Sequence, residues 1–305
     1  MKALIGVEDY GGFSSAANAM ETVQSNISTH ISKLESELDA VLVDRRTGSL
    51  TLEGAAVAAR ARMILKEMEA IQSDLFALKN DVRGSVRMGM IGTTARWLIP
   101  LLVPELRQRH PNLHFEVSEG TTTSLEAKLH NGTVDLALVN KPSYSEDFAF
   151  KSLFDEEYVL FLNDSHPLAS RTSVTIADLD GLELMVPPKG IPFRDLLDTL
   201  AKRSKVEFNV IAEVDGVRLI ASMAFDGYAP AIIPATAVPH YLSDFAVVPV
   251  SDLPNRRIGI SRRRRALESA PMISVLGLLD EIFCQEGTSM FPMPQGTRKI
   301  SQYKP

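Results

Sequence analysis

Short, polar, uncharged side chains cluster in one segment near the N-terminus. Gln24, Ser25, Asn26, Ser28 and Thr29 fill five of six consecutive positions. A helix that faces only solvent normally carries Glu and Lys at such positions, so this composition is unusual for a plain surface. Gln pairs bidentately with adenine, and Ser, Thr and Asn bond to base edges or phosphates in a DNA groove. The segment therefore favours base reading.

The apolar residues around this cluster predict a helix that presents it on one face. These residues are Ile27, Ile31, Leu34 and Leu38. Their spacings of 4, 3 and 4 place them together on the face opposite the polar cluster. A shorter helix is expected before it, with Ser14 as its N-cap and Thr22 as the N-cap of the second helix. Residues 13–35 thus form a candidate helix-turn-helix, whose second helix enters the major groove.

A small hairpin is expected after the second helix. Two short apolar pieces, at 42–43 and 50–52, flank a turn that holds Arg45 and Arg46. Basic side chains at such a tip suit the flanking DNA backbone or the minor groove. The candidate DNA contacts are Ser14, Gln24, Ser25, Asn26, Ser28, Thr29, Lys33, Arg45 and Arg46.

The charge of this region opposes strong contact with phosphates. In residues 1–52, four basic side chains face seven acidic ones, which leaves a net charge of −3, and the whole chain carries −6. Phosphate neutralisation supplies most non-specific affinity for DNA. We therefore expect weak non-specific binding by one chain, with specificity from polar base reading and added affinity from oligomers.

Residues 54–80 predict one long helix with an apolar seam. The seam residues are Val57, Ala61, Ile64, Met68, Ile71 and Leu75. They alternate spacings of 4 and 3, which is the heptad pattern of a coiled coil. Dimerisation through this seam is the favoured interpretation, and packing onto the following domain is the alternative. Residues 81–85 break the pattern and are expected to form a hinge.

From residue 86 onward the pattern alternates between strands and helices. The first set has strands at 86–91, 114–117 and 134–139 with helices at 97–109 and 124–131. The second set has strands at 158–162, 182–186, 210–214, 231–233 and 247–250 with helices at 193–203 and 217–225. A strand at 257–260 and a helix at 272–284 close the pattern. This order predicts parallel sheets covered by helices on both faces.

Two pairs of threonines follow predicted strands and mark a candidate ligand cleft. Thr93 and Thr94 come directly after the first strand, and Thr121 and Thr122 follow the second. Ligands of such folds bind at the carboxyl ends of parallel strands, and a helix N-terminus with hydroxyls favours an anion. The alternative is that the hydroxyls only cap their helices. No ligand identity follows from these residues.

Residues 13–54 resemble the N-terminal winged domain of LysR-type transcriptional regulators. The matching residues are Phe13, Ser14, Ala16, Ala17, Gln24, Ser28, Ile31, Leu34, Glu35, Glu37, Leu38, Leu42, Arg45, Leu50, Thr51 and Gly54. Further landmarks are His166-Pro167-Leu168-Ala169 and the segment from Gly227 to Pro234. The family often has Arg where Thr29 stands. Its first helix also begins several residues before Leu4, so either the start lies upstream or this helix is short.

The resemblance implies an α/β chain with a winged helix-turn-helix, a long linker helix and a two-lobed, Rossmann-like domain of the type 2 periplasmic-binding-protein kind. The expected divisions are 1–53 for DNA binding, 54–80 for the linker helix, 81–85 for the hinge, 86–158 with 254–286 for subdomain I, 159–253 for subdomain II, and 287–305 for a flexible tail. By resemblance, Pro188, Gly190 and Tyr228 line the pocket across from the threonines.

The resemblance also implies partners. Such regulators bind double-stranded DNA as homodimers or homotetramers and respond to a small metabolite, usually an anion. An activator would contact RNA polymerase as well. Two rivals stay open: a ligand-binding module whose N-terminal segment serves only in oligomerisation, and an enzyme on a doubly wound fold.

Sequence motifs for catalysis, metals and membranes are missing. The six histidines are scattered, and one cysteine cannot form a disulfide within the chain. No GxSxG, GxGxxG or phosphate-binding loop occurs, so neither an enzyme activity nor a cofactor or metal is expected. No apolar run of about 18 residues appears, and we expect a cytoplasmic protein without a membrane partner.

Overall fold

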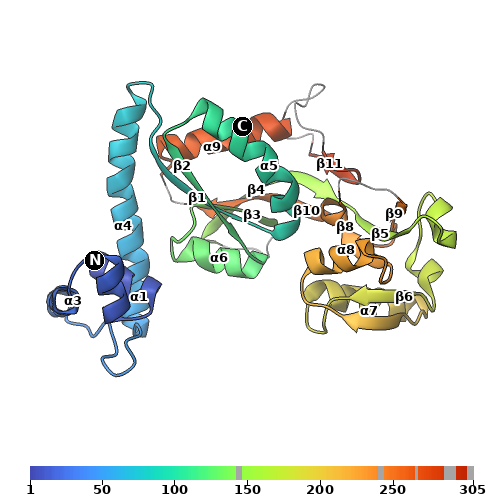
Figure 1. The fold of residues 1–305 in the computed structure, drawn as a ribbon, viewed down its shortest axis with the longest axis horizontal. Coiled ribbons are helices and arrows are strands. Elements are labelled where there is room, and N and C mark those ends of the chain that lie inside the picture. The colour runs from blue at the N-terminus through green and yellow to red at the C-terminus, as the bar shows by residue number, and fades with distance from the viewer. Residues whose placement is uncertain (142–145, 240–243, 265–266, 285–292, 301–305) are drawn as a thin grey trace.

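The computed structural model describes residues 1–141, 146–239, 244–264, 267–284 and 293–300. It has three parts: a small helical head at the N-terminus, one long helix, and two α/β lobes that follow one another (Figure 1). Among the described residues, no helix combines the length and the apolar character needed to span a bilayer.

The head is built on three helices around a small apolar core. They are α1 (Lys2–Tyr10), α2 (Phe13–Ala19) and α3 (Gln24–Leu38). Leu4, Ile27 and Ile31 are completely buried or nearly so, and they pack against Leu42 from the hairpin. The helix-turn-helix is therefore present, and Ile27, Ile31 and Leu34 form the expected buried face, but Leu38 in the last turn is 47% exposed, so the prediction is wrong for that residue.

Both predicted N-caps of the head are wrong by one or two residues. The N-cap of α2 is Gly12, whose φ of 146° suits glycine, and Ser14 lies inside the first turn. The N-cap of α3 is Val23, while the hydroxyl of Thr22 accepts a 3.0 Å hydrogen bond from the Asn26 side chain. Since a helix can begin without a side-chain cap, a nearby Ser or Thr did not mark the boundary.

The hairpin after α3 is a minimal wing. Val43 and Leu50 form one antiparallel bridge, and the Asp44 carbonyl accepts a 2.8 Å bond from the Gly48 amide. Gly54, at the start of the next helix, lies against this hairpin: a Cβ there would be 1.9 Å from the Leu42 carbonyl oxygen. Glycine is thus required for the wing to meet the long helix.

The long helix, α4 (Leu52–Ala77), begins two residues before the predicted start at residue 54 and ends three residues before the predicted end at residue 80. Ala61 is buried by the protein itself, and Val57 packs on the core of the head. The other seam residues, Ile64, Met68, Ile71 and Leu75, are between 47% and 62% exposed. The opposite face of α4 meets the first lobe, so packing onto the following domain also occurs, but through different residues.

The first lobe, lobe I, contains a sheet of six described strands in the order β11-β4-β10-β3-β1-β2. The strands are β1 (Gly84–Met90), β2 (Leu113–Glu119), β3 (Leu136–Asn140), β4 (Phe148–Glu156), β10 (Arg256–Arg263) and β11 (Thr297–Lys299). Helices α5 (Gly92–Arg109) and α9 (Ala270–Cys284) lie on one face, and α6 (Thr122–His130) lies on the other (Figure 1). Met88, Leu138 and Phe154 form its buried centre.

Lobe I differs from the sequence-based prediction in four ways. Strand β4 was not expected from the sequence. The sheet is mixed, because β10 runs antiparallel to both β3 and β4. Helix α5 begins five residues before the expected Trp97, so Pro100 and Pro104 lie inside the helix and not in its first turns. Strand β11 occupies part of the predicted flexible tail, whose positions 287–292 and 301–305 lie outside the described residues.

The second lobe, lobe II, has five described strands in the order β7-β6-β8-β5-β9. These are β5 (Tyr158–Asn163), β6 (Glu183–Val186), β7 (Asn209–Glu213), β8 (Ala231–Pro234) and β9 (Phe245–Pro249), with helices α7 (Pro192–Ser204) and α8 (Val217–Phe225) and three 3-10 turns at 167–170, 176–179 and 235–237. Tyr158 already pairs with Pro234 in this sheet, so the chain enters lobe II one residue before the predicted boundary. This sheet is also mixed, because β5 runs antiparallel to β8 and β9, so the prediction of a parallel sheet is wrong here too.

Candidate nucleic-acid interface and ligand cleft

The N-terminal end of α3 presents the polar cluster to solvent. Gln24, Ser25, Asn26 and Thr29 are exposed, and Ser28 is half-buried. Gln24 is held from the side, because the Ser14 hydroxyl in α2 donates a 3.0 Å hydrogen bond to its Oε1. The structure therefore brings two candidate DNA contacts together and leaves the amide NH₂ of Gln24 as a donor toward a groove.

Arg45 does not extend from the wing as the sequence suggested. Its guanidinium donates to the hydroxyls of Ser28 and Ser32, each at 3.1 Å, and to the Glu35 carboxylate at 2.7 Å. It also lies 5.0 Å above the centre of the Phe13 ring. Arg45 thus braces the wing against α3. Four polar side chains of the head, Arg45, Ser28, Ser32 and Glu35, are joined by these hydrogen bonds.

Glu35 completes this brace from α3. Its Oε1 accepts from the amides of Leu42 and Val43, at 2.8 and 3.2 Å. Burial of the carboxyl raises its pKa, but the bonds from Leu42, Arg45 and Val43 outweigh burial and hold the pKa of Glu35 below its ordinary value. The ionised carboxylate is therefore the form on which the wing depends.

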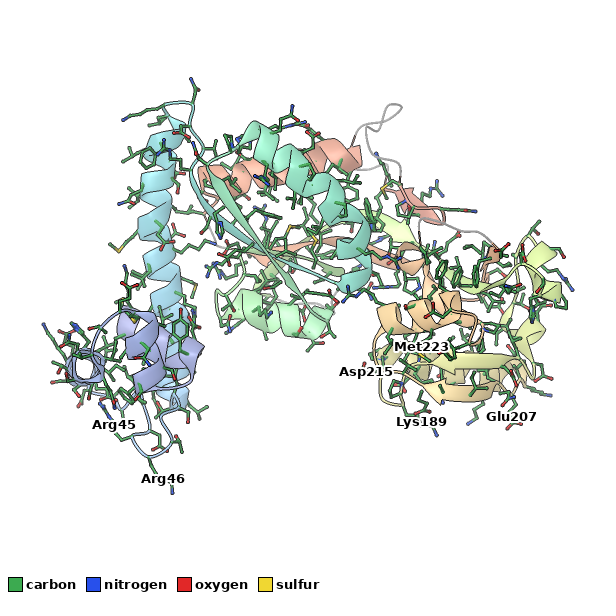
Figure 2. All side chains as sticks on the ribbon, viewed as in Figure 1. Arg45, Arg46, Lys189, Glu207, Asp215 and Met223 are labelled. Carbon is green, nitrogen blue, oxygen red and sulfur yellow. The ribbon has the colours of Figure 1, made fainter. Side chains whose placement is uncertain are left out.

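Arg46 is the exposed cation at the tip of the wing. Figure 2 shows its side chain pointing away from the head, beyond Arg45. No carboxylate of the described residues forms an ion pair with the Arg46 guanidinium. Two other candidates are engaged within α3: Thr29 donates to the Ser25 carbonyl at 2.8 Å, and Lys33 lies 3.9 Å from Glu37.

Thr93 and Thr94 lie in the first turn of α5, and neither is its N-cap, which is Ile91. They are only 5% and 0% exposed, and their hydroxyls have no hydrogen-bond partner among the described residues. A buried hydroxyl without a partner costs roughly 1–3 kcal/mol. The capping alternative therefore fails for this pair, since neither hydroxyl bonds to an amide of α5.

Thr121 behaves differently. Its hydroxyl accepts a 3.2 Å bond from the Ser124 amide and caps α6, as the alternative interpretation expected. On lobe II, Pro188 is half-buried while Gly190 and Tyr228 are exposed. Figure 2 places Lys189, between Pro188 and Gly190, along the lower edge of lobe II.

Arg194 supports the lobe II side of the cleft and was missed from the sequence. It is 6% exposed and donates to the Pro187 carbonyl at 2.9 Å and to Glu213 at 2.8 Å. These acceptors stand at the carboxyl ends of β6 and β7. Its position in the first turn of α7, where the helix dipole disfavours a cation, was the available signal.

Three contacts cross directly between the lobes. Arg96 donates to the Ala237 carbonyl at 3.1 Å, and the buried Glu156 carboxylate accepts from both the amide and the hydroxyl of Thr236, at 3.1 and 2.7 Å. The third is the ion pair of Arg218 with Glu119, at 2.8 Å. In the described part of the chain, no group of three His, Cys, Asp or Glu residues is arranged to hold a metal.

A helix-turn-helix head followed by a two-lobed ligand-binding domain defines a DNA-binding transcription regulator, and comparison with known proteins agrees. The LysR substrate binding domain matches residues 79–283, and the bacterial regulatory helix-turn-helix of the lysR family matches residues 1–55. The chain therefore belongs to the LysR family of transcriptional regulators.

Relatives of the chain are regulators of the same family. It is 28% identical over 301 residues to a probable hydrogen peroxide-inducible genes activator of Mycobacterium leprae, with 94% of each chain covered. It is 27% identical to the DNA-binding transcriptional dual regulator OxyR of Escherichia coli, over 86% of this chain and 88% of that one. These relatives are regulators and not enzymes.

Solved structures share the fold. Full-length OxyR from Pseudomonas aeruginosa has a TM-score of 0.74 at 23% identity, covering 100% of this chain and 97% of that one. Full-length CbnR in complex with its target DNA has a TM-score of 0.62 at 22% identity, covering 91% and 96%. The shared fold includes the head, the linker helix and both lobes.

Proposed function

We propose that this regulator binds its operator as a homodimer or a dimer of dimers, in the cytoplasm, under the control of a small anionic metabolite held between the lobes. The proposal that a metabolite binds between the lobes rests on the buried hydroxyls of Thr93 and Thr94, which have no hydrogen-bond partner among the described residues. The anion follows from their place at the N-terminus of α5, where the helix dipole favours negative charge.

DNA reading is assigned to the exposed polar face of α3. Fluorescence anisotropy with DNA from beside its own gene tests this. Gln24→Ala should lower specific affinity by about tenfold, since a good bidentate base contact contributes roughly 1–3 kcal/mol. Ser36→Ala, an exposed position at the far end of the same helix, is the matched control and should bind as the wild type does.

Dimerisation is assigned to the exposed seam of α4. Ile71→Lys should give a monomer in light scattering and lower operator affinity by about 100-fold, because two linked heads bind far more tightly than one. Glu69→Lys places the same charge on the same helix, away from the seam, and should remain dimeric. A monomeric wild type, or a dimeric Ile71→Lys variant, would contradict this assignment.

The ligand is sought by a thermal-shift screen of small organic acids, because a specific ligand stabilises the native state by mass action. Thr93→Ala should abolish the shift and leave DNA binding intact; loss of both would contradict the assignment. Hydrogen peroxide belongs in the screen because of the relatives' names, although Cys284 alone cannot form a disulfide within the chain. For an activator, RNA polymerase is a further partner.

A further inference from the structure

One exposed ion pair joins lobe I to lobe II beside the start of α5. Nη2 of Arg218, in the first turn of α8 on lobe II, lies 2.8 Å from Oε1 of Glu119, the last residue of β2 on lobe I. Both side chains are about half exposed, at 53% and 44%, so the pair is weak and easily displaced.

The Glu119 carboxylate lies against the N-terminus of α5. A Cβ on Gly92, the first residue of that helix, would be 2.4 Å from Oε1 of Glu119 and 3.0 Å from Nε of Arg218. The next two residues are Thr93 and Thr94, with their buried, unpartnered hydroxyls. A carboxylate of the protein thus lies beside the first residue of α5, where the helix dipole favours an anion, without bonding to either threonine hydroxyl.

Arg218 sits where a cation is unfavourable on its own. The positive end of the α8 dipole opposes an arginine in the first turn, and that turn contains no acidic residue. Asp215, three residues earlier, is another carboxylate near this end of α8 and lies on the left side of lobe II in Figure 2. Arg218 and Glu119 therefore lie together beside Gly92, with Glu119 as the anion paired with Arg218.

We propose that Glu119 is a built-in competitor of the effector, and that a small carboxylic acid binds by displacing Glu119 from Arg218. This inference rests on the proposed function of the cleft and adds the chemical class of the ligand and the group that it replaces. Displacement breaks one contact between the lobes. The Arg96–Ala237 and Glu156–Thr236 bonds remain, so the lobes readjust about the crossover and do not separate.

Binding of malonate to the full-length protein tests the proposal. Malonate is titrated against sodium chloride of equal ionic strength, and binding is followed by calorimetry. Removal of the competitor in Glu119→Gln should tighten malonate binding two- to fivefold, the range expected for an exposed ion pair. Arg218→Gln should weaken it at least tenfold. Glu116→Gln removes a charge from an exposed position of the same strand and should bind as the wild type does.

A second measurement uses DNA and no ligand. Operator affinity of unliganded Glu119→Gln should shift in the direction that saturating malonate shifts the wild type. The proposal is overturned if Glu119→Gln and wild type bind malonate equally, or if malonate binds neither. If Thr93→Ala abolishes binding of an organic acid while Arg218→Gln does not, the cleft remains the effector site and only the role of Glu119 fails.

Discussion

The head and the cleft treat their polar side chains in opposite ways. In the head, Ser14 holds Gln24, and Arg45 links Ser28 to Glu35, so the groups nearest the DNA face are bonded to one another. In the cleft, Thr93 and Thr94 are buried with hydroxyls that no described residue satisfies. The polar side chains of the head are already hydrogen-bonded to one another before DNA binds. The threonine hydroxyls of the cleft lack hydrogen-bond partners, which we propose that a ligand supplies.

This difference has energetic consequences. A preorganised surface loses little entropy on binding, which helps a head that carries net negative charge to bind DNA at all. Unpartnered buried hydroxyls lower the free energy of unfolding, and such a loss of stability is typical of functional positions. Substitutions in the head should therefore cost stability, and matched substitutions in the cleft should increase it.

The largest expected effect is at the contact between the wing and α4. Gly54→Ala forces a methyl group into the Leu42 carbonyl and should destabilise the head by about 3 kcal/mol. Hydrogen exchange of the α1–α3 amides measures this local free energy. Ala55→Gly, at the exposed neighbouring position, should cost only about 1 kcal/mol through helix propensity. Equal effects of the two would argue against a tightly packed head.

Glu35→Ala should destabilise the wing by about 2 kcal/mol, because it removes bonds from two amides and a guanidinium to a charged group. The effect depends on pH. The pKa of Glu35 is lowered in the folded head, so its contribution is present above the unfolded value of about 4.3 and is lost as the pH falls through the folded pKa. The protection factor of the Leu42 amide, which corrects for the intrinsic pH dependence of exchange, should fall in acid in the wild type and change little in Glu35→Gln.

Thr94→Val should act in the opposite direction. The change keeps the shape of a fully buried side chain and removes an unpartnered hydroxyl, so stability should rise by about 1 kcal/mol while the effector response is lost. Thr133→Val is the control, because the Thr133 hydroxyl donates to the Lys128 carbonyl and its removal should cost about 1 kcal/mol. Denaturant unfolding compares them, and destabilisation by Thr94→Val would show that its hydroxyl has a partner.

The smallest expected effect is a difference between Arg45 and Arg46, the two arginines of the wing, in the salt dependence of DNA binding. Arg46→Gln should reduce the slope of log K against log salt by about one, as expected for the loss of one phosphate contact. Arg45→Gln should weaken binding with almost no change in slope, because Arg45 bonds to Glu35, Ser28 and Ser32. A reduced slope for Arg45→Gln would mean that Arg45 leaves its brace for the DNA.

Periodic patterns carried most of the fold prediction. The spacing of Ile27, Ile31 and Leu34 located the buried face of α3, and the range Val217–Phe225 was obtained without error. These elements follow from local sequence because a single face is buried. The start of α5 was misplaced, since Pro100 is typical of a first helical turn and Gly92 is not. Strand β11 depends on pairing with β4, which no local pattern reveals.

The residues of the candidate sites also divide into those that local sequence predicted and those that it missed. Residue type identified Gln24 and Thr93, because a polar face and a strand-to-helix junction are visible in sequence. Arg218 and Glu119 were missed, since they pair with each other from distant parts of the chain. The bond from Arg194 to Glu213, which is 19 residues away, was missed for the same reason. Arg45 was predicted as a DNA contact, and its bonds to Ser28, Ser32 and Glu35 were not foreseen, because these three partners meet only in the folded head.

One turn of α4 forms ion pairs with both the DNA-binding head and lobe I. Arg62 is 8% exposed and lies 2.7 Å from Glu8 in α1, and Lys66, four residues later, pairs with the buried Asp135 of lobe I. The seam proposed for dimerisation runs along the other side of this same helix. The helix is thus anchored to lobe I and to the DNA-binding head within about 6 Å of its length. We expect a rotation of lobe I to reach the head through these ion pairs, without passing through the predicted hinge at 81–85, of which Gly84 and Ser85 already belong to β1.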